Sequence, residues 1–182
     1  SAVFLQYETA LRHLSLLLQG GDEVITEFHI HVYHLFIVVS LLTGQIPARS
    51  TFNIPVLAAN LNPLYFSLTQ AMRTGDLDKY LDILHDNAAM EVFEKDNMVQ
   101  FVLRLETTIV GAKLKQITSI YHKLSLEKVG QLLGGMNDKK SYSFTDVYGF
   151  VTKAIADGTI EAYIDDDAVL HSISYEKQYD SG

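Results

Sequence analysis

The chain has 182 residues, of which 48% are hydrophobic and 20% charged, so a packed core is expected and global disorder is not. Its net charge of −8 argues against nonspecific binding to nucleic acid or to an anionic membrane, because both require a basic surface. The absence of cysteine excludes disulfides, thiolate zinc sites and cysteine nucleophiles.

Hydrophobic residues at helical spacing predict two helices at the start of the chain, over residues 2–18 and 22–43. Glycines that follow each range are stop signals, and Asp22 is the expected cap of the second helix. The stretch 45–55 contains two prolines and is expected to be an irregular connector. The apolar run 35–42 is far shorter than the about 20 residues that a membrane span requires.

Four more helices are expected before residue 122. The first follows Asn62-Pro63 and ends at Gly75, and the second is capped by Asp76. Two others cover residues 88–93 and about 97–121. The expected buried positions of the first two are Leu64, Leu68, Ala71 and Met72, and then Leu77, Tyr80, Leu81 and Leu84.

The hydrophobic pattern changes after Tyr121. A short helix capped by Ser125 is followed by a polar loop and by a helix whose start, Ser143 with Asp146, resembles a capping box. Two alternating stretches then predict a β-hairpin. The sequence therefore predicts a mainly α fold, in which a helical-repeat bundle over residues 1–118 precedes a winged helix with a small antiparallel hairpin over 119–175. Residues 176–182 are expected to be a frayed tail.

Three histidines in "HIHVYH", His29, His31 and His34, raise the question of a zinc site. Their spacing resembles that of the zinc deubiquitinases of the JAMM type, but Thr43 stands where that pattern has a metal-binding aspartate. On a helix, moreover, His29 and His31 point in different directions. We therefore expect polar or interfacial histidines, with no metal and no cofactor.

The chain shows no motif for nucleophilic catalysis or phosphate binding. A G-x-S-x-G elbow, a P-loop and a G-x-G-x-x-G turn are all absent. The run Asp165-Asp166-Asp167 lacks the ligand spacing of a calcium loop, so a solvated hairpin turn is expected there. No catalytic residue, enzymatic activity or small-molecule substrate is predicted.

A winged helix can bind DNA, but the charge of this one argues against it. From residue 119 to the end there are six Lys or Arg against ten Asp or Glu, a balance of about −4. The helix that would enter a major groove carries Lys153 as its one basic residue. Since contacts to phosphate dominate DNA affinity, the hairpin is instead expected to pair with a strand of another protein.

Two stretches carry a resemblance to a known family. A helical array followed by "YHKLSLEKVGQLL" and by "VTKAIADGTIEAYID" is similar to the PCI module of the proteasome lid, the signalosome and a translation initiation factor complex. Within that class, residues 34–172 resemble the family of the third non-ATPase regulatory subunit of the proteasome lid. The connector from Gly44 to Phe52 and the helix before Gly75 are the most specific features of this resemblance.

The sequence departs from that family at two places. Glu106 and Thr107 stand where the family has basic or amide residues, and the loop "GGMNDKKSYS" is longer than expected. The chain also stops shortly after the winged helix, where the family continues, so a fragment of a longer protein is expected.

The resemblance implies a non-catalytic scaffold subunit that pairs with other PCI subunits of the lid in ubiquitin-dependent protein degradation, in the cytoplasm and nucleus, without nucleic acid or membrane as a partner. The alternatives are the paralogous signalosome subunit and a PCI protein of messenger-RNA export that binds nucleic acid. We expect the partner interface at one of the two hairpin strands. The residues concerned are Thr159, Ile160, Glu161, Ala162, Tyr163, Ile164 and Asp165 in the first, and Val169, His171 and Ile173 in the second.

Overall fold

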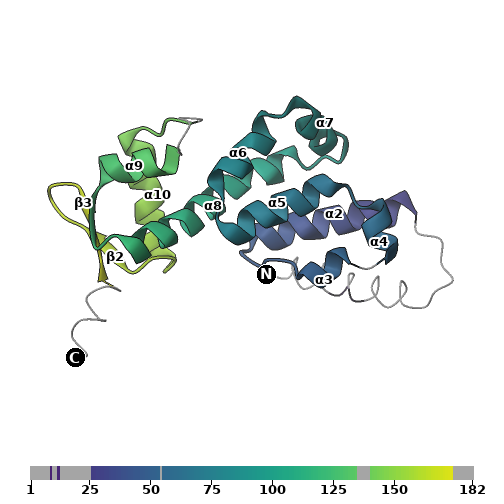
Figure 1. The fold of residues 1–182 in the computed structure, drawn as a ribbon, viewed down its shortest axis with the longest axis horizontal. Coiled ribbons are helices and arrows are strands. Elements are labelled where there is room, and N and C mark those ends of the chain that lie inside the picture. The colour runs from purple at the N-terminus through teal and green to yellow at the C-terminus, as the bar shows by residue number, and fades with distance from the viewer. Residues whose placement is uncertain (1–8, 10–11, 13–25, 54, 135–139, 174–182) are drawn as a thin grey trace.

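The structure is a computed structural model that describes residues 9, 12, 26–53, 55–134 and 140–173. The expected tail at 176–182 and most of the expected helix at 2–18 lie outside these residues. The fold is mainly helical, with a small antiparallel sheet near the end of the chain, as predicted (Figure 1).

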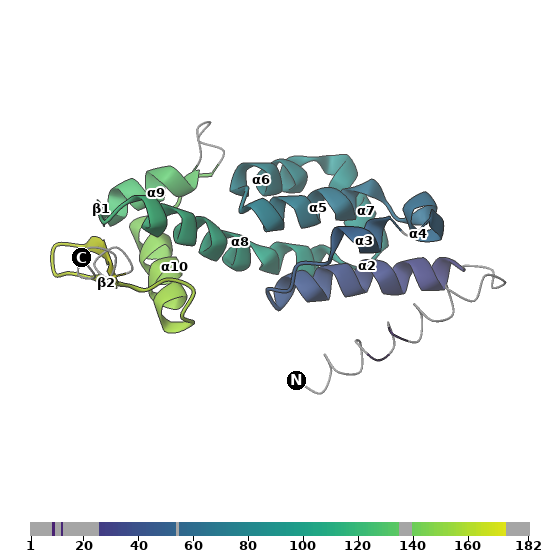
Figure 2. The same cartoon turned by 60° about the horizontal axis from the view of Figure 1, so that its bottom comes forward.

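Seven helices of the described residues precede the sheet. They are α2 (Glu27–Leu42), α3 (Arg49–Phe52), α4 (Pro55–Asn60), α5 (Pro63–Thr74), α6 (Leu77–His85), α7 (Asn87–Lys95) and α8 (Val99–Ile120). We call α2 to α7 the helical arm, and α8 runs from it to the sheet (Figures 1 and 2). None of the helices in the described part of the chain combines the length and the apolar character needed to cross a membrane.

The start of α2 differs from the prediction. Thr26 has an extended backbone, with φ −89° and ψ 160°, and α2 begins at the next residue. The Thr26 N–H donates to Nδ1 of His29 at 3.1 Å, so the histidine supplies an acceptor for the helix entry. The expectation that α2 begins at a cap on Asp22 is therefore wrong.

The connector after α2 is more ordered than expected. It contains the single helical turn α3, and its last residue, Pro55, is the first residue of α4. Proline suits that position, because the first residues of a helix have no internal acceptor for their N–H groups. The expectation of a fully irregular connector is wrong, although the prolines do interrupt the helices as predicted.

The caps predicted around α5 and α6 are confirmed. Gly75 has a left-handed φ of 64°, and a Cβ added there would lie 2.7 Å from Nε2 of Gln116. Asp76 accepts a hydrogen bond from the Lys79 N–H at 3.0 Å. The buried face of α5 differs from the prediction, since Leu64 is half-buried and the residues buried there are Tyr65, Leu68, Thr69, Ala71 and Met72.

Helix α8 connects the helical arm to the sheet. It packs against α2, α5, α6 and α7 in the arm, and against α9 (Leu126–Gly134), α10 (Phe144–Ala156) and β3 (Val169–Ser172) beyond it (Figure 2). Its buried side chains include Val102, Leu105, Ile109, Val110 and Leu114, which belong to one continuous core. The expected boundary after residue 118 falls inside its last turn, so the division at that point stays a prediction.

The winged helix consists of α9, α10 and a three-stranded sheet of β1 (Lys123–Ser125), β2 (Ala162–Ile164) and β3 (Val169–Ser172). The capping box at the start of α10 is present, because Ser143 and Asp146 exchange hydrogen bonds. Strand β1 was not predicted. It pairs with β3 and gives the strand order β1-β3-β2.

Candidate functional site

Strand β3 is hydrogen-bonded on both sides. Toward β1, the Ser172 N–H donates to the carbonyl of His122, and the Leu126 N–H donates to the carbonyl of Ala168. Toward β2, the Ile173 N–H donates to the carbonyl of Glu161, and the Asp165 N–H donates to the carbonyl of Val169. A central strand offers no edge. The alternative in which Val169, His171 and Ile173 form a free edge is therefore wrong.

Strand β2 lies at an edge of the sheet formed by the described residues. In an antiparallel pair, hydrogen-bonded residues alternate with residues whose backbone groups point away. Glu161 and Asp165 bond to β3, and the register places Tyr163 opposite His171 in the same series. The N–H and C=O groups of Ala162 and Ile164 therefore point away from β3. We call residues 161–165 the β2 edge.

The side chains of the first hairpin strand alternate as predicted. Ile160 and Ala162 are 4% and 6% exposed, and Ile164 is half-buried, so these three face the core. Thr159, Glu161 and Tyr163 are exposed. The strand thus has an apolar inner face and a polar outer face. The backbone groups of Ala162 and Ile164 that point away from β3 lie in the plane of the sheet, between these two faces.

The hairpin turn is held by Asp165, which is more than a solvated acid. Its Oδ1 accepts the N–H groups of Asp167 and Val169, each at 3.0 Å, and its Oδ2 lies 2.7 Å from Nε2 of His171. The bond to His171, followed by the backbone bonds, lowers the pKa of Asp165 below its ordinary value. An ionised carboxylate can only accept, so Nε2 of His171 is the donor.

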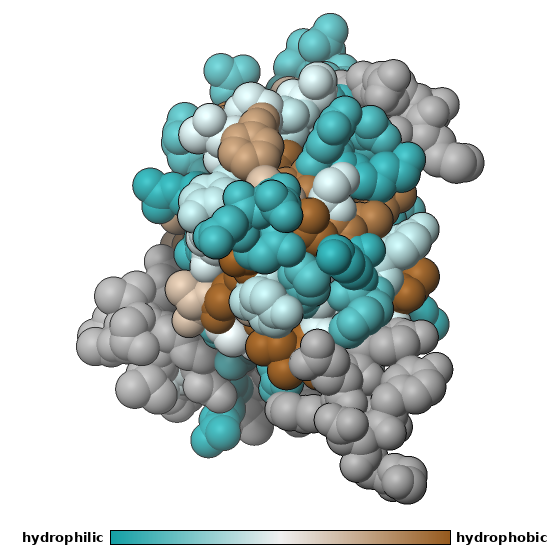
Figure 3. Space-filling model, turned by 90° about the vertical axis from the view of Figure 1, so that its left-hand side faces the viewer, coloured by the Kyte–Doolittle hydropathy of each residue, from teal (hydrophilic) through white to brown (hydrophobic). Residues whose placement is uncertain are grey.

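Tyr163 and His171 stack face to face on the outer side of the sheet. Their ring centroids are 4.7 Å apart and the planes differ by 2°. The strand register adds Lys123 of β1 opposite His171, which gives an outward row of lysine, histidine and tyrosine across the sheet. Tyr163 remains 46% exposed, although its position is restricted by the stack. The end of the molecule that carries this sheet is largely hydrophilic, with hydrophobic surface between the polar side chains (Figure 3).

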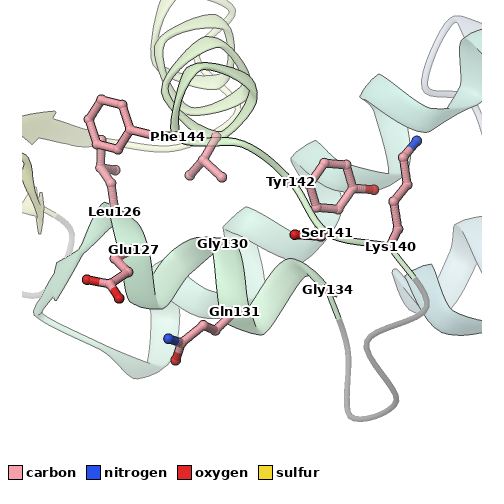
Figure 4. Close-up of a pocket in the computed structure, with 10 residues that line it drawn as sticks. Leu126, Glu127, Gly130, Gln131, Gly134, Lys140, Ser141, Tyr142 and Phe144 are labelled. Atoms are coloured by element: carbon pink, nitrogen blue, oxygen red, sulfur yellow. The ribbon is translucent and has the colours of Figure 1, made fainter.

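A separate pocket of about 250 Å³ lies between α9 and the start of α10. Figure 4 shows Lys140 at one side of it, directed away from Glu127 and Gln131. The Lys140 ammonium pairs with Glu106 of α8, and the Tyr142 hydroxyl donates to the same carboxylate at 3.0 Å. Burial, and then the Glu106 charge, raises the pKa of Tyr142, so this phenol stays protonated as a donor. These groups are engaged in joining the loop to α8.

The three histidines of α2 are not brought together as a metal site. His29 caps the helix, whereas His34 is buried and lies between Asp96 and the Asn62 N–H. Within the described ranges, no cluster of three or more His, Asp or Glu could hold a metal ion. The arrangement accounts for His29 and His34 as structural residues.

A comparison with known families identifies the fold. The family described as "PCI domain" matches residues 77–170, which include α6 to α10 and the sheet except for the end of β3. The chain belongs to the PCI domain family. The PCI match spans the last helices of the arm and the winged helix together. A second family, "PSMD3-like, N-terminal TPR repeats", matches residues 1–69.

The chain also resembles curated proteins from several organisms. The chain is 31% identical over 164 residues to "26S proteasome non-ATPase regulatory subunit 3" of Dictyostelium discoideum, covering 90% of the chain and 31% of the relative. It is 34% identical over 166 residues to "Probable 26S proteasome regulatory subunit rpn3" of Schizosaccharomyces pombe, covering 90% and 32%. With homolog B of subunit 3 in Arabidopsis thaliana it shares 36% identity over 138 residues, covering 76% and 27%. The chain therefore spans about a third of the length of these relatives.

Sequence reasoning missed strand β1 and the role of Asp165 in this PCI module. Ser125 was interpreted only as a helix cap, and it does accept the Lys128 N–H of α9 at 3.3 Å. The same residue is also the last residue of β1, so the cap signal gave no indication of the strand. Asp165 had a usable signal, because aspartate at the start of a turn commonly accepts backbone N–H groups two residues further on. The stack of Tyr163 on His171 depends on strand register and had no such signal.

Proposed function

We propose that this chain is part of a non-catalytic scaffold subunit of the proteasome regulatory-particle lid, and that it pairs with other PCI subunits through its winged helix. The PCI domain and the relatives named as regulatory subunit 3 of the 26S proteasome support the assignment to the lid. The observation that supports pairing is the β2 edge, where Ala162 and Ile164 direct backbone groups away from β3.

In this proposal the helical-repeat part of the chain, residues 1–118, holds the winged helix of residues 119–175 in a fixed orientation. The shared helix α8 supports this role, because its buried side chains pack against both parts. Degradation of ubiquitinated proteins would then be the activity of the assembly and not of this chain. The subunit would work where the proteasome works, in the cytoplasm and nucleus, with proteins as its partners.

The assignment is tested by affinity purification of the full-length protein, followed by mass spectrometry of the proteins that accompany it. Recovery of proteasome ATPases together with PCI subunits of the lid supports the proposal. Recovery of signalosome subunits alone contradicts it. A salt-sensitive shift of duplex DNA or RNA by the purified protein, at submicromolar concentration, would favour the messenger-RNA export alternative.

The interface is tested by two proline substitutions in the β2 edge. Ala162→Pro removes a donor that points away from β3, so the winged helix is expected to fold while incorporation into the lid is lost. Tyr163→Pro removes a donor within the sheet and is expected to destabilise the winged helix itself. Circular dichroism melts separate the two effects. Normal incorporation of a folded Ala162→Pro protein would show that β2 is not the pairing edge.

A further inference from the structure

We propose that the β2 edge selects a basic partner strand, which carries lysine or arginine at its ends and an arginine beside Tyr163. This inference rests on the proposed function, because it takes the β2 edge as the docking strand. It adds the chemistry of the partner, which neither the family nor the fold defines. Three features of the edge support it: its charge, the stacked tyrosine and the cost of pairing with a second copy.

Acidic side chains lie at both ends of the β2 edge. Glu161 is exposed before the strand, and Asp166 and Asp167 are exposed after it. The Asp165 carboxylate between them is kept ionised by its bonds to His171 and to the backbone. Within the described strands and their hairpin turn, Lys123 is the one lysine or arginine, and it lies on the far strand, β1. A strand with basic ends would complement this pattern.

Tyr163 supplies a contact for the middle of the partner strand. Its ring stacks on His171 on the β3 side, so its other face is directed toward an incoming strand. A strand that bonds to Ala162 and Ile164 places its own residue opposite Tyr163 in a non-hydrogen-bonded pair, where side chains approach most closely. A guanidinium group there would stack on an aromatic face that already has a restricted position.

A second copy of this chain is a poor occupant of the same edge. Antiparallel pairing of two β2 strands around Tyr163 would place Glu161 of one copy opposite Asp165 of the other. Like charges that face each other across strands are destabilising. Asp166 and Asp167 would extend the repulsion beyond the strand ends. The edge thus favours a strand of different composition over its own copy.

The test uses fluorescent peptides and the purified chain. The basic probe is a short strand of alternating valine and threonine with a central arginine and a lysine at each end. The acidic probe has glutamate at each end, and a third probe replaces the central arginine by leucine. By fluorescence anisotropy at low salt, the basic probe is expected to bind about tenfold more tightly than the acidic one. The difference should shrink at about 0.5 M salt, where charges are screened.

Matched variants locate the two contacts. Asp166→Lys with Asp167→Lys should remove the preference for basic ends, whereas Glu91→Lys with Glu94→Lys makes the same charge change on the exposed surface of α7 and should not. Tyr163→Ala should lower affinity for the arginine probe several-fold, and Tyr163→Phe should retain it. Tyr148→Ala is the control, since Tyr148 is 48% exposed but lies on α10.

The outcomes separate this inference from the proposed function. Loss of binding in Ala162→Pro, together with a preference for the basic probe that the aspartate swap removes, supports both. If Ala162→Pro abolishes binding but the wild-type chain binds the acidic and basic probes equally, the inference of a basic partner is wrong, while the β2 edge is still supported as the docking strand. Unchanged binding of the basic probe to folded Ala162→Pro would overturn both. Self-association at low salt that disappears in Ala162→Pro would also overturn the choice of a basic partner.

Discussion

His34 donates a hydrogen bond from Nδ1 to Oδ2 of Asp96 at 3.1 Å, and this bond joins α2 to the turn after α7. The same Asp96 oxygen accepts the Tyr65 hydroxyl at 2.5 Å, and the Asn62 N–H donates to Nε2 of His34 at 3.3 Å. The His34 ring also stacks on Tyr65 with centroids 3.9 Å apart. Because Nε2 accepts and Nδ1 donates, the site fits a neutral histidine.

This site predicts that the chain loses stability in mild acid. Burial, which outweighs the attraction of Asp96, lowers the pKa of His34 below its ordinary value of 6.5. The unfolded chain therefore binds a proton at a pH where the folded chain does not. Stability is full above about pH 6.5 and falls as the pH drops toward the folded-state pKa. The measurement is the free energy of unfolding in urea at pH 7.5 and pH 5.5.

His34→Gln provides the control for the acid effect. Glutamine can donate and accept hydrogen bonds but does not titrate in this range. The variant is expected to be less stable at pH 7.5, because it loses the stack on Tyr65, yet to show a smaller drop between the two pH values. An equal drop in both proteins would mean that another group causes the acid effect.

Ser40→Ala is expected to stabilise the chain. Ser40 is 2% exposed on α2, and its Oγ has no hydrogen-bond partner among the described residues. Removing a buried hydroxyl without a partner should raise the free energy of unfolding by about 1 kcal/mol. Thr69→Val is the matched control, since the Thr69 hydroxyl donates to the Tyr65 carbonyl at 2.8 Å and should give no gain. Urea unfolding measures both, and a destabilised Ser40→Ala would contradict the prediction.

Ala168→Gly is expected to relieve strain in the hairpin turn. Ala168 has a φ of 58°, a left-handed conformation that disfavours residues with a Cβ. Relief of this strain should stabilise the folded chain by about 1 kcal/mol, and the greater conformational entropy of glycine in the unfolded chain offsets part of that gain. The reverse change, Gly158→Ala at φ 72°, has space for a Cβ and should cost a similar amount through backbone strain alone. Thermal melts that move in the same direction for both variants would argue against strain as the cause.

Glu106→Gln is expected to loosen the loop before α10. Glutamine keeps an acceptor for Tyr142 but loses the ion pair with Lys140, whose side chain is 40% exposed. Partial exposure limits the loss to roughly 1 kcal/mol or less. Hydrogen exchange should show faster exchange at residues 140–143 in the variant than in the wild type. Glu94→Gln on the exposed face of α7 is the control, and equal exchange at residues 140–143 in all three proteins would contradict the prediction.

The two departures from the family noted in the sequence meet in the structure. Glu106 lies on α8, and the loop before α10 brings Lys140 and Tyr142 to its carboxylate. A basic residue at position 106 would repel Lys140. The sequence could indicate that both places are unusual, but their contact depends on how α8 and the loop pack.

Much of the helical fold could be predicted because its signals are local. Asp76, Ser143 and Gly75 act within one helical turn of their own positions, so their side-chain or backbone chemistry reports the helix ends directly. The predicted start at Asp22 was wrong, since Thr26 and His29 form the cap. Several oxygens and nitrogens in that stretch can cap a helix, and packing of α2 decides which one does.

The candidate site could be predicted in part. Alternation of apolar and polar residues from Thr159 to Asp165 gave the inner and outer faces of the first hairpin strand, because that period is a property of the strand itself. It left open which hairpin strand is the edge. That depends on β1, whose residues come about forty positions earlier in the sequence and whose pairing with β3 is long-range.

The sequence by itself determined most of the helices, the caps of α5, α6 and α10, the acidic hairpin and the resemblance to PCI proteins, since these reside in residue types and in spacing along the chain. The tertiary structure decided the strand order β1-β3-β2 and the contact of Glu106 with Lys140 and Tyr142. It also decided that the backbone groups of Ala162 and Ile164 point outward. The physical reason is that hydrogen-bond partners and burial depend on which distant segments come into contact. The local pattern of residue types along one segment does not specify those contacts.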